Sequence, residues 1–265
     1  MELEVRDISK DFGGVRALAH VSFTVRGNEL LGLIGPNGAG KTTLINILDG
    51  VHRPTGGQVW FNGERIDGLP PYEIARRGIG RTFQVTRAFG RMTVLENLMV
   101  PALARNPRAR QQDFYDQALQ VLNFLTIDHL VNEYARGLSG GQQKLLELGR
   151  LLMLDPDIII LDEPFAGVHP KLMETIYEYI VEVNKQGKAI ILISHDMESI
   201  FTLSRRLLVL NYGQVIADGE PKIVRENPGV IEAYLGEEEE DIGPVNEEHG
   251  LTALLEQKAG ERGDA

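Results

Sequence analysis

Cysteine is absent from all 265 residues of the sequence. Disulfide bonds and thiolate metal sites are therefore excluded, and cysteine usage indicates no redox compartment. Long hydrophobic runs are also missing, because Ile158 to Leu161 and Ala189 to Ile193, the longest, fall far short of the roughly 20 residues of a spanning helix. Met1 to Asp7 carries charges where a signal peptide has an apolar segment. We therefore expect a cytoplasmic chain that does not cross the membrane.

Negative charge predominates, with a formal net charge of -11, which disfavours nucleic acid as a partner. Residues 237 to 265 hold ten acidic and two basic side chains, so most of the excess lies in this segment. The segment opens with Glu237 to Asp241, a run of like charges without apolar side chains. We therefore expect a folded domain over residues 1–236 and an acidic, disordered tail over residues 237–265.

Short aliphatic runs alternate with amphipathic stretches, a pattern typical of an α/β domain whose parallel sheet is covered by helices on both faces. Buried strands are predicted at Leu30 to Ile34, Ile158 to Asp162, Ala189 to Ser194 and Leu207 to Leu210. Helices are predicted from Leu44 onward and over Pro170 to Asn184. Between them, apolar residues recur at helical spacing over Asp113 to Leu125, and we expect a helical insert over about residues 92–155.

A glycine-rich stretch, LIGPNGAGKTT at residues 33 to 43, lies between a predicted strand and a predicted helix. It satisfies the pattern G-x-x-x-x-G-K-[ST], in which backbone N–H groups and the helix N-terminus face phosphates. The lysine would neutralise the β- and γ-phosphate oxygens, and the hydroxyl that follows it would bind Mg²⁺. The predicted nucleotide-binding residues are Gly35, Pro36, Asn37, Gly38, Ala39, Gly40, Lys41, Thr42 and Thr43, with Thr42 also a metal ligand.

Two adjacent acids end the aliphatic strand at Ile158 to Asp162. This arrangement predicts Asp162 beside Mg²⁺ and Glu163 facing the γ-phosphate, as the base that receives or orients the attacking water. His195 follows another buried strand, so it should emerge at the carboxyl edge of the sheet, within reach of the γ-phosphate.

A second anion site is indicated by Leu138 to Gln142, which precedes an apparent helix over Gln143 to Leu154. A serine and two glycines at a helix start offer backbone N–H groups and the positive end of the dipole. A phosphate loop alone is shared by kinases, GTPases and ATPases, and the acid pair Asp162-Glu163 narrows these classes. Leu138 to Gln142 is a weak motif alone, but it is highly specific in this order and company.

These motifs, in this order, resemble those of the ATP-binding subunits of ABC transporters, over Leu3 to about Gly236. The resemblance implies a RecA-like P-loop core, with an antiparallel β portion and the helical insert as a subdomain. It implies that two such subunits, identical or homologous, close head to tail around ATP. The roles it implies are adenine stacking for Phe12, catalysis for Glu163 and His195, catalysis and metal sensing for Gln84, and trans phosphate binding for Ser139, Gly140, Gly141 and Gln142.

Three further stretches are similar to the branched-chain amino acid importer subgroup: Arg81 to Gln84, Met92 to Leu98 and Asn227 to Gly236. This similarity implies an ATPase on the cytoplasmic face of the membrane, coupled to permease subunits and, indirectly, to an external solute-binding protein. Two positions depart from the family pattern. His169 replaces a frequent Asp, and Lys144-Leu145 replaces a frequent Gln-Arg.

Other classes stay open at this point. An ABC exporter ATPase has the same motifs, and this chain determines neither the direction of transport nor the solute. A soluble ABC ATPase in DNA repair or on ribosomes usually has a long coiled-coil insert or two ATPase halves, which are missing here. A P-loop kinase or GTPase leaves Ser139 to Gln142 unexplained, and no Asn-Lys-x-Asp guanine motif is present.

Overall fold

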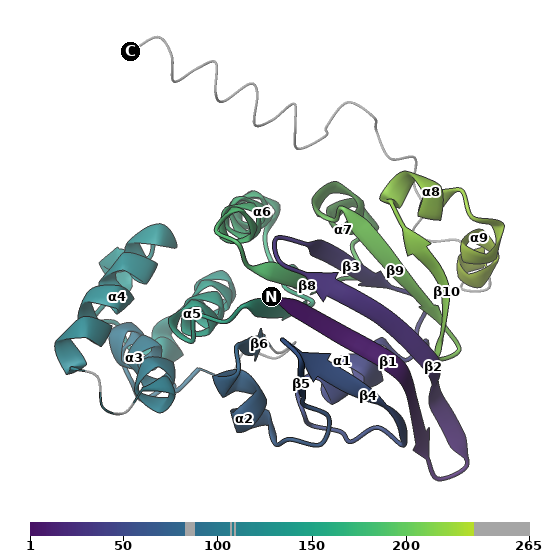
Figure 1. Cartoon of the computed structure of the whole chain (residues 1–265). Coiled ribbons are helices and arrows are strands. Elements are labelled where there is room, and N and C mark those ends of the chain that lie inside the picture. Colours follow the sequence, from purple (N-terminus) through teal and green to yellow (C-terminus); the bar gives the residue numbers. More distant parts are fainter. Residues whose placement is uncertain (83–87, 107, 109, 236–265) are drawn as a thin grey trace.

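A computed structural model describes residues 1–82, 88–106, 108 and 110–235 of the chain. Two sheets lie together, and a group of helices projects to one side of them (Figure 1). The strands are β1 (Glu2–Phe12), β2 (Val15–Arg26), β3 (Leu30–Ile34), β4 (Gly56–Phe61), β5 (Glu64–Arg65), β6 (Ile79–Arg81), β7 (Ile158–Asp162), β8 (Ala189–Ile193), β9 (Arg206–Asn211) and β10 (Gln214–Gly219). The helices are α1 (Lys41–Leu48), α2 (Pro71–Arg76), α3 (Val94–Arg105), α4 (Gln111–Phe124), α5 (Gly140–Met153), α6 (Pro170–Lys185), α7 (Met197–Leu203), α8 (Pro221–Arg225) and α9 (Pro228–Leu235), with short 3₁₀ helices at Asp128–Leu130 and Ala135–Gly137.

The larger sheet has the strand order β10-β9-β3-β8-β7-β6, parallel except for β10 at one edge. All four predicted strands are confirmed, with ends within one residue of the prediction. Because parallel strands end at the same edge, the residues that follow β3, β7 and β8 share the carboxyl edge of the sheet.

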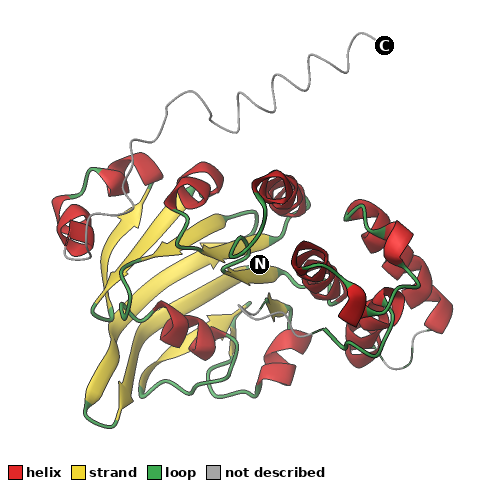
Figure 2. Ribbon diagram, turned by 180° about the vertical axis from the view of Figure 1, so that it is seen from behind, coloured by secondary structure: helices red, strands yellow, loops and turns green. Residues whose placement is uncertain are grey.

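The two faces of this sheet bury alternate residues of each strand. Leu30 and Ile159 belong to a core formed with α5, α6 and α7, whereas Leu31 and Ile158 belong to a core formed with α1, β1, β2 and β4. The prediction of helices on both faces was therefore incomplete, because an antiparallel sheet in the order β2-β1-β4-β5 shares the second face with α1 (Figure 2). Its strand β1 mixes buried and exposed residues, so it lacks the continuous aliphatic run that identified the central strands.

The helical group consists of α3, α4 and α5, which pack on one another at the left of Figure 1. Helix α5 begins at Gly140, three residues before the predicted start at Gln143. The glycines have low helix propensity, but a capping box sets the start. The backbone N–H of Ser139 donates to Gln142 Oε1 at 2.9 Å, and the N–H of Gln142 donates to Ser139 Oγ at 3.4 Å.

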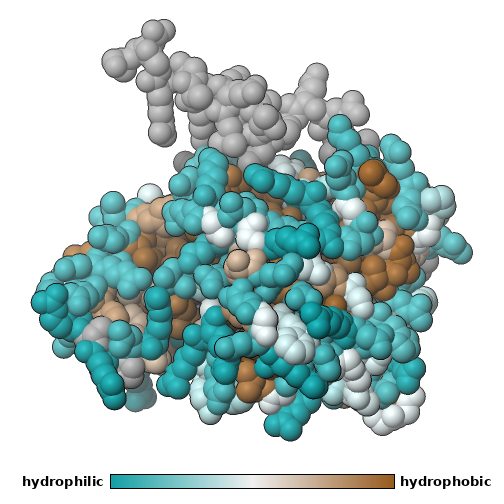
Figure 3. All heavy atoms as spheres, in the orientation of Figure 1, coloured by the Kyte–Doolittle hydropathy of each residue, from teal (hydrophilic) through white to brown (hydrophobic). Residues whose placement is uncertain are grey.

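The surface seen from the side of Figure 1 is predominantly hydrophilic, with apolar side chains in small separate areas (Figure 3). Across the described ranges, none of the helices combines the length and the apolar composition needed to span a membrane.

Candidate functional site

The phosphate loop connects β3 to α1, and its glycines adopt backbone conformations that other residues rarely adopt. The φ angles are 148° at Gly35, 77° at Gly38 and 102° at Gly40. A Cβ atom at Gly35 would lie 2.1 Å from the carbonyl oxygen of Leu210, whereas a Cβ at Gly38 would meet nothing within 4 Å. The loop therefore packs closely on the sheet at its start and leaves open space at its middle.

Lys41 is the first residue of α1 and folds back over the loop. Its Nζ donates to the carbonyl oxygen of Pro36 at 3.1 Å and also to that of Gly35. Asn37, Gly38 and Thr42 are exposed, and Thr43 is half-buried. An exposed loop that offers a lysine and a helix N-terminus is suited to bind the negatively charged phosphate chain of ATP.

The turn between β9 and β10 supports the loop, and sequence reasoning did not identify it. The N–H of Gly213 donates to the carbonyl oxygen of Ala39 at 3.0 Å, and the carbonyl of Gly213 accepts from Ala19 at 2.8 Å. A Cβ at Gly213, where φ is 75°, would lie 2.5 Å from the carbonyl oxygen of Ala17. The sequence signal was a glycine after a Tyr in a tight turn between two apolar strands.

The predicted catalytic acid directly follows β7 and faces the predicted histidine. Glu163 is buried, its backbone φ is 51°, and its N–H donates to the carbonyl of Ile193 at 2.9 Å. Glu163 Oε2 accepts from the backbone N–H of His195 at 3.2 Å, and Oε1 lies 3.6 Å from His195 Nε2. The His195 side chain is 64% exposed, so it covers the buried Glu163 carboxylate from the solvent side of the carboxyl edge.

Burial raises the pKa of Glu163 above its ordinary value, although the backbone N–H and ring of His195 act in the opposite direction. Asp162 also raises this pKa by charge repulsion, and Lys41 lowers it by attraction. Glu163 follows Asp162 directly and contacts His195, so these three residues share the carboxyl edge, and Lys41 of the phosphate loop acts on Glu163 by charge.

Asp162 is held by Arg81, a residue that sequence reasoning noted only as part of a subgroup stretch. Arg81 Nη2 donates to Asp162 Oδ2 at 2.8 Å, and the N–H of Asp162 donates to Thr82 Oγ1 at 3.2 Å. Gln84, two residues after Thr82, lies outside the described residues.

The predicted second anion site lies at the start of α5, in the helical group. Helix α5 packs on α3 and α4, whereas α1 packs on β2, so the two loops belong to different parts of the chain (Figure 1). Ser139 and Gly140 are exposed, and Gly141 and Gln142 are half-buried. A Cβ at Gly141 would lie 2.3 Å from Leu172 Cδ2, so the glycine permits close packing on α6.

Phe12 ends β1, and its side chain is 44% exposed. Its ring lies edge-on to His52, with 5.3 Å between centroids, and Lys10 Nζ lies 4.8 Å from its centroid. The returning strand β2 passes beneath the phosphate loop, where a Cβ at Gly40 would lie 2.7 Å from the carbonyl of Ala17. An exposed ring on this hairpin is accessible for stacking on a base.

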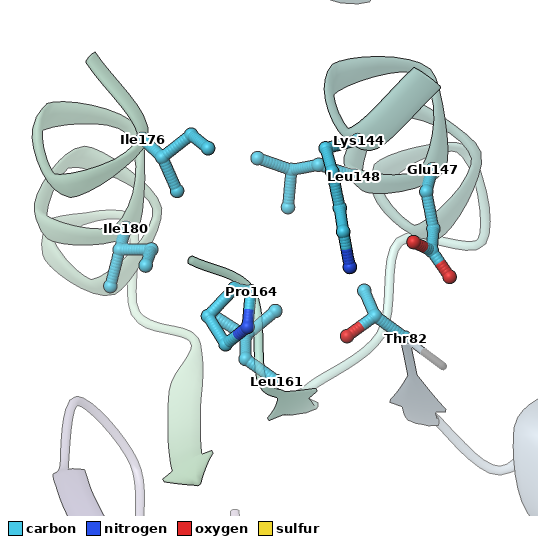
Figure 4. A pocket seen from close by; sticks show the side chains of 8 residues that line it. All are labelled: Thr82, Lys144, Glu147, Leu148, Leu161, Pro164, Ile176 and Ile180. Atoms are coloured by element: carbon cyan, nitrogen blue, oxygen red, sulfur yellow. The ribbon is translucent and has the colours of Figure 1, made fainter. Parts of the chain in front are cut away.

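A cavity of about 20 Å³ separates α5 from α6 near the ends of β6 and β7 (Figure 4). Its volume is close to that of a single water molecule, so it holds no nucleotide. Lys144, one of the two departures from the family pattern, lines this cavity, and its amino group points toward Thr82 and Pro164 (Figure 4). The other departure, His169, is exposed and immediately precedes α6.

Comparison with known proteins supports the family resemblance seen in the sequence motifs. The family model "ABC transporter" matches residues 18–166, and the model "Branched-chain amino acid ATP-binding cassette transporter" matches residues 214–240. A relative from Salmonella typhimurium, the high-affinity branched-chain amino acid transport ATP-binding protein LivG, is 41% identical and covers 89% of this chain and 98% of its own. A probable branched-chain amino acid transport ATP-binding protein LivG from Archaeoglobus fulgidus is 38% identical, with coverage of 91% and 97%.

Two solved structures share the fold. An ATP-binding cassette of an ABC transporter in its ADP conformation has a TM-score of 0.79 and 37% identity, and covers 89% of this chain and 100% of its own. A dimeric cassette in a post-hydrolysis state, bound to ADP and Pi, has a TM-score of 0.75 and 26% identity, with coverage of 83% and 98%. The predicted fold class is confirmed, including its antiparallel β portion. The chain belongs to the ABC transporter family, as an ATP-binding protein of its branched-chain amino acid subgroup.

Proposed function

We propose that this chain hydrolyses ATP to power import of branched-chain amino acids through separate permease subunits. The observation that carries the proposal is the buried Glu163 carboxylate, which faces His195 at the carboxyl edge and interacts electrostatically with Lys41 of the phosphate loop. The relatives whose names specify branched-chain amino acid transport support the choice of substrate class.

The phosphate loop binds ATP. Backbone N–H groups of Gly35 to Thr43 and the Lys41 ammonium hold the β- and γ-phosphates, and Phe12 stacks on the adenine. Thr42, Asp162 and Gln84 would hold Mg²⁺, a hard cation that suits hydroxyl, carboxylate and amide oxygens. When bound, Mg²⁺ neutralises charge on the phosphates.

Glu163 acts on the attacking water. The carboxylate accepts a proton as the water oxygen bonds to the γ-phosphorus and the bond to the bridging oxygen breaks, which releases ADP and phosphate. A carboxylate with a raised pKa is a stronger base than an ordinary one, and His195 holds it in place through its backbone N–H. His195 itself is exposed and available to the γ-phosphate.

A second ATP-binding subunit completes each site. Ser139, Gly140, Gly141 and Gln142 of one chain contact the ATP held by the phosphate loop of the other, and closure excludes water. The exposure of Ser139 and Gly140, in a part of the chain distant in sequence from the phosphate loop, supports this arrangement. The helical group contacts the permease, which places the complex on the cytoplasmic face of the membrane.

Reconstitution with a permease tests the proposal. We expect the chain to copurify with a membrane permease. Vesicles that contain the complex, supplied with the external solute-binding protein, should take up leucine, isoleucine or valine only with ATP on the side of this chain. Efflux of solute instead of uptake would indicate the exporter alternative. Full ATPase activity without any permease would indicate a soluble ABC ATPase.

A further inference from the structure

A single arginine connects the helix that follows the phosphate loop to the strand that carries the metal-side acid. Arg81 is the last residue of β6, the edge strand, and it lies opposite Ile160 in the parallel pairing with β7. Beyond it, the N–H of Thr82 donates to the carbonyl of Ile160 at 2.9 Å. The Arg81 backbone is therefore fixed beside the end of β7.

The guanidinium contacts both elements. Arg81 Nη2 donates to Asp162 Oδ2 at 2.8 Å, while Nη1 donates to Asn46 Oδ1 at 2.7 Å and also to Asp49 Oδ2. Asn46 lies in α1, and Asp49 is the residue at its C-terminal cap. Helix α1 carries Thr42, another proposed metal ligand, in its first turn. One planar group therefore fixes Asp162 relative to the helix of Thr42.

Burial makes these contacts strong and specific. The exposed fractions of the side chains are 8% for Arg81, 12% for Asp49 and 14% for Asp162. Charge-assisted hydrogen bonds from a guanidinium fix the direction of a carboxylate, whereas the ammonium of lysine acts as a point charge. A carboxylate with one oxygen bonded to arginine keeps further lone pairs with which to face the cation.

We propose that Arg81 is a positioning residue, which orients the Asp162 carboxylate toward the cation that accompanies ATP and so raises the affinity of the site for Mg²⁺. The inference rests on the proposed function, because it takes Asp162 as the metal-side acid. Loss of an outer partner of a metal ligand typically weakens metal affinity about 10- to 100-fold.

The experiment measures ATP binding to the full chain by calorimetry, once with Mg²⁺ and once with EDTA. The quantity compared is the Kd in EDTA divided by the Kd with Mg²⁺, which is the gain in ATP affinity that Mg²⁺ provides. We expect Arg81→Lys to reduce this ratio about 10-fold with little change in Kd in EDTA, because the charge stays and the fork is lost. Asp49→Asn is the matched control, since it perturbs the same cluster but keeps the contact between Arg81 and Asp162. Its ratio should equal that of the wild type.

A second variant covers the case in which Arg81→Lys does not fold. Arg81→Met combined with Asp49→Leu replaces the buried Arg81–Asp49 pair by apolar side chains, a change that folded proteins often tolerate, and also removes the arginine partner of Asp162. It should also lower the ratio. An unchanged ratio in the folded Arg81 variants would overturn the inference, and a higher ratio would show that Arg81 acts as a repelling charge instead.

Asp162→Asn separates this inference from the proposed function. If Asp162→Asn lowers the ratio and the Arg81 variants do not, only the positioning role fails. If Asp162→Asn leaves the ratio unchanged, Asp162 is not the metal-side acid and the proposed function itself is contradicted.

Discussion

At the residue scale, Glu163 separates nucleotide binding from turnover. We expect Glu163→Gln to keep ATP binding and to stop multiple turnover, because the amide preserves shape but accepts no proton. Lys41→Ala provides the contrast, since it should weaken ATP binding itself. Calorimetric ATP binding and phosphate release measure the two effects. Undiminished phosphate release by Glu163→Gln would refute the assigned role.

The raised pKa of Glu163 predicts the acid side of the pH profile. Because the ionised carboxylate is the active form, kcat/KM should fall as pH decreases through a value above the ordinary glutamate pKa of 4.5. Steady-state kinetics across acidic pH give this value. A midpoint at or below 4.5 would contradict the effect of burial.

The raised pKa of Glu163 also predicts how stability depends on pH, and the dependence is opposite in sign to that of a carboxylate whose pKa is lowered by an ion pair. The folded chain binds the Glu163 proton more tightly than the unfolded chain, so wild-type unfolding free energy decreases as pH rises from 4.5 through the raised pKa. Glu163→Gln removes this decrease. Denaturant unfolding of both proteins between acidic and neutral pH should show the difference growing with pH.

Single residues were predictable where a short pattern carries its own chemistry. Glycines or polar residues that follow aliphatic strands identified the phosphate loop, Asp162, Glu163 and His195. In the structure these residues follow β3, β7 and β8, at the carboxyl edge of the larger sheet. Arg81 was not predictable as a partner of Asp162, since the two are separated by about 80 positions and meet only through the β6–β7 pairing.

At the element scale, the β9–β10 turn supports the phosphate loop, and Gly213→Ala tests this support. An alanine there takes a left-handed conformation, which costs roughly 1–2 kcal/mol, and its Cβ also meets the carbonyl of Ala17. We expect weaker ATP binding together with lower stability, measured by calorimetry and denaturant unfolding.

Gly63→Ala is the matched control for this prediction. Gly63 has φ of 81° in the β4–β5 turn, but its Cβ would meet nothing within 4 Å. The control should lose stability without losing ATP affinity. Equal ATP affinities for the two variants would contradict the supporting role of Gly213.

Helices and strands differ in how closely the sequence predicts them. Buried parallel strands such as β3 and β7 are continuous aliphatic runs, so the sequence predicts them closely. The strands β1 and β2 have one face toward the core and mixed residues on the other. Their pattern gave no strand prediction, and only the family resemblance implied an antiparallel β portion. Helix α5 began earlier than predicted because a capping box outweighed the low helix propensity of two glycines.

At the scale of the whole molecule, the acidic tail is predicted to be dispensable for catalysis. Residues 237–265 carry most of the net charge of -11, and every nucleotide motif precedes them. Removal of these residues should leave the ATPase rate unchanged and raise the isoelectric point above 5.1. A large loss of rate would show that the tail takes part in the reaction.

The central claim is that each ATP lies between the phosphate loop of one chain and Ser139 of another. The absence of cysteine makes a clean test available, since Asn37→Cys and Ser139→Cys each introduce the only thiol in a chain. Both positions are exposed, and both variants would carry Glu163→Gln so that ATP remains bound. The measurement is thiol crosslinking of the mixed variants with a short bifunctional reagent, with and without Mg-ATP. We predict a crosslinked dimer that forms only with ATP. Crosslinking within one chain of the double variant at high dilution, or equal crosslinking without ATP, would contradict the claim.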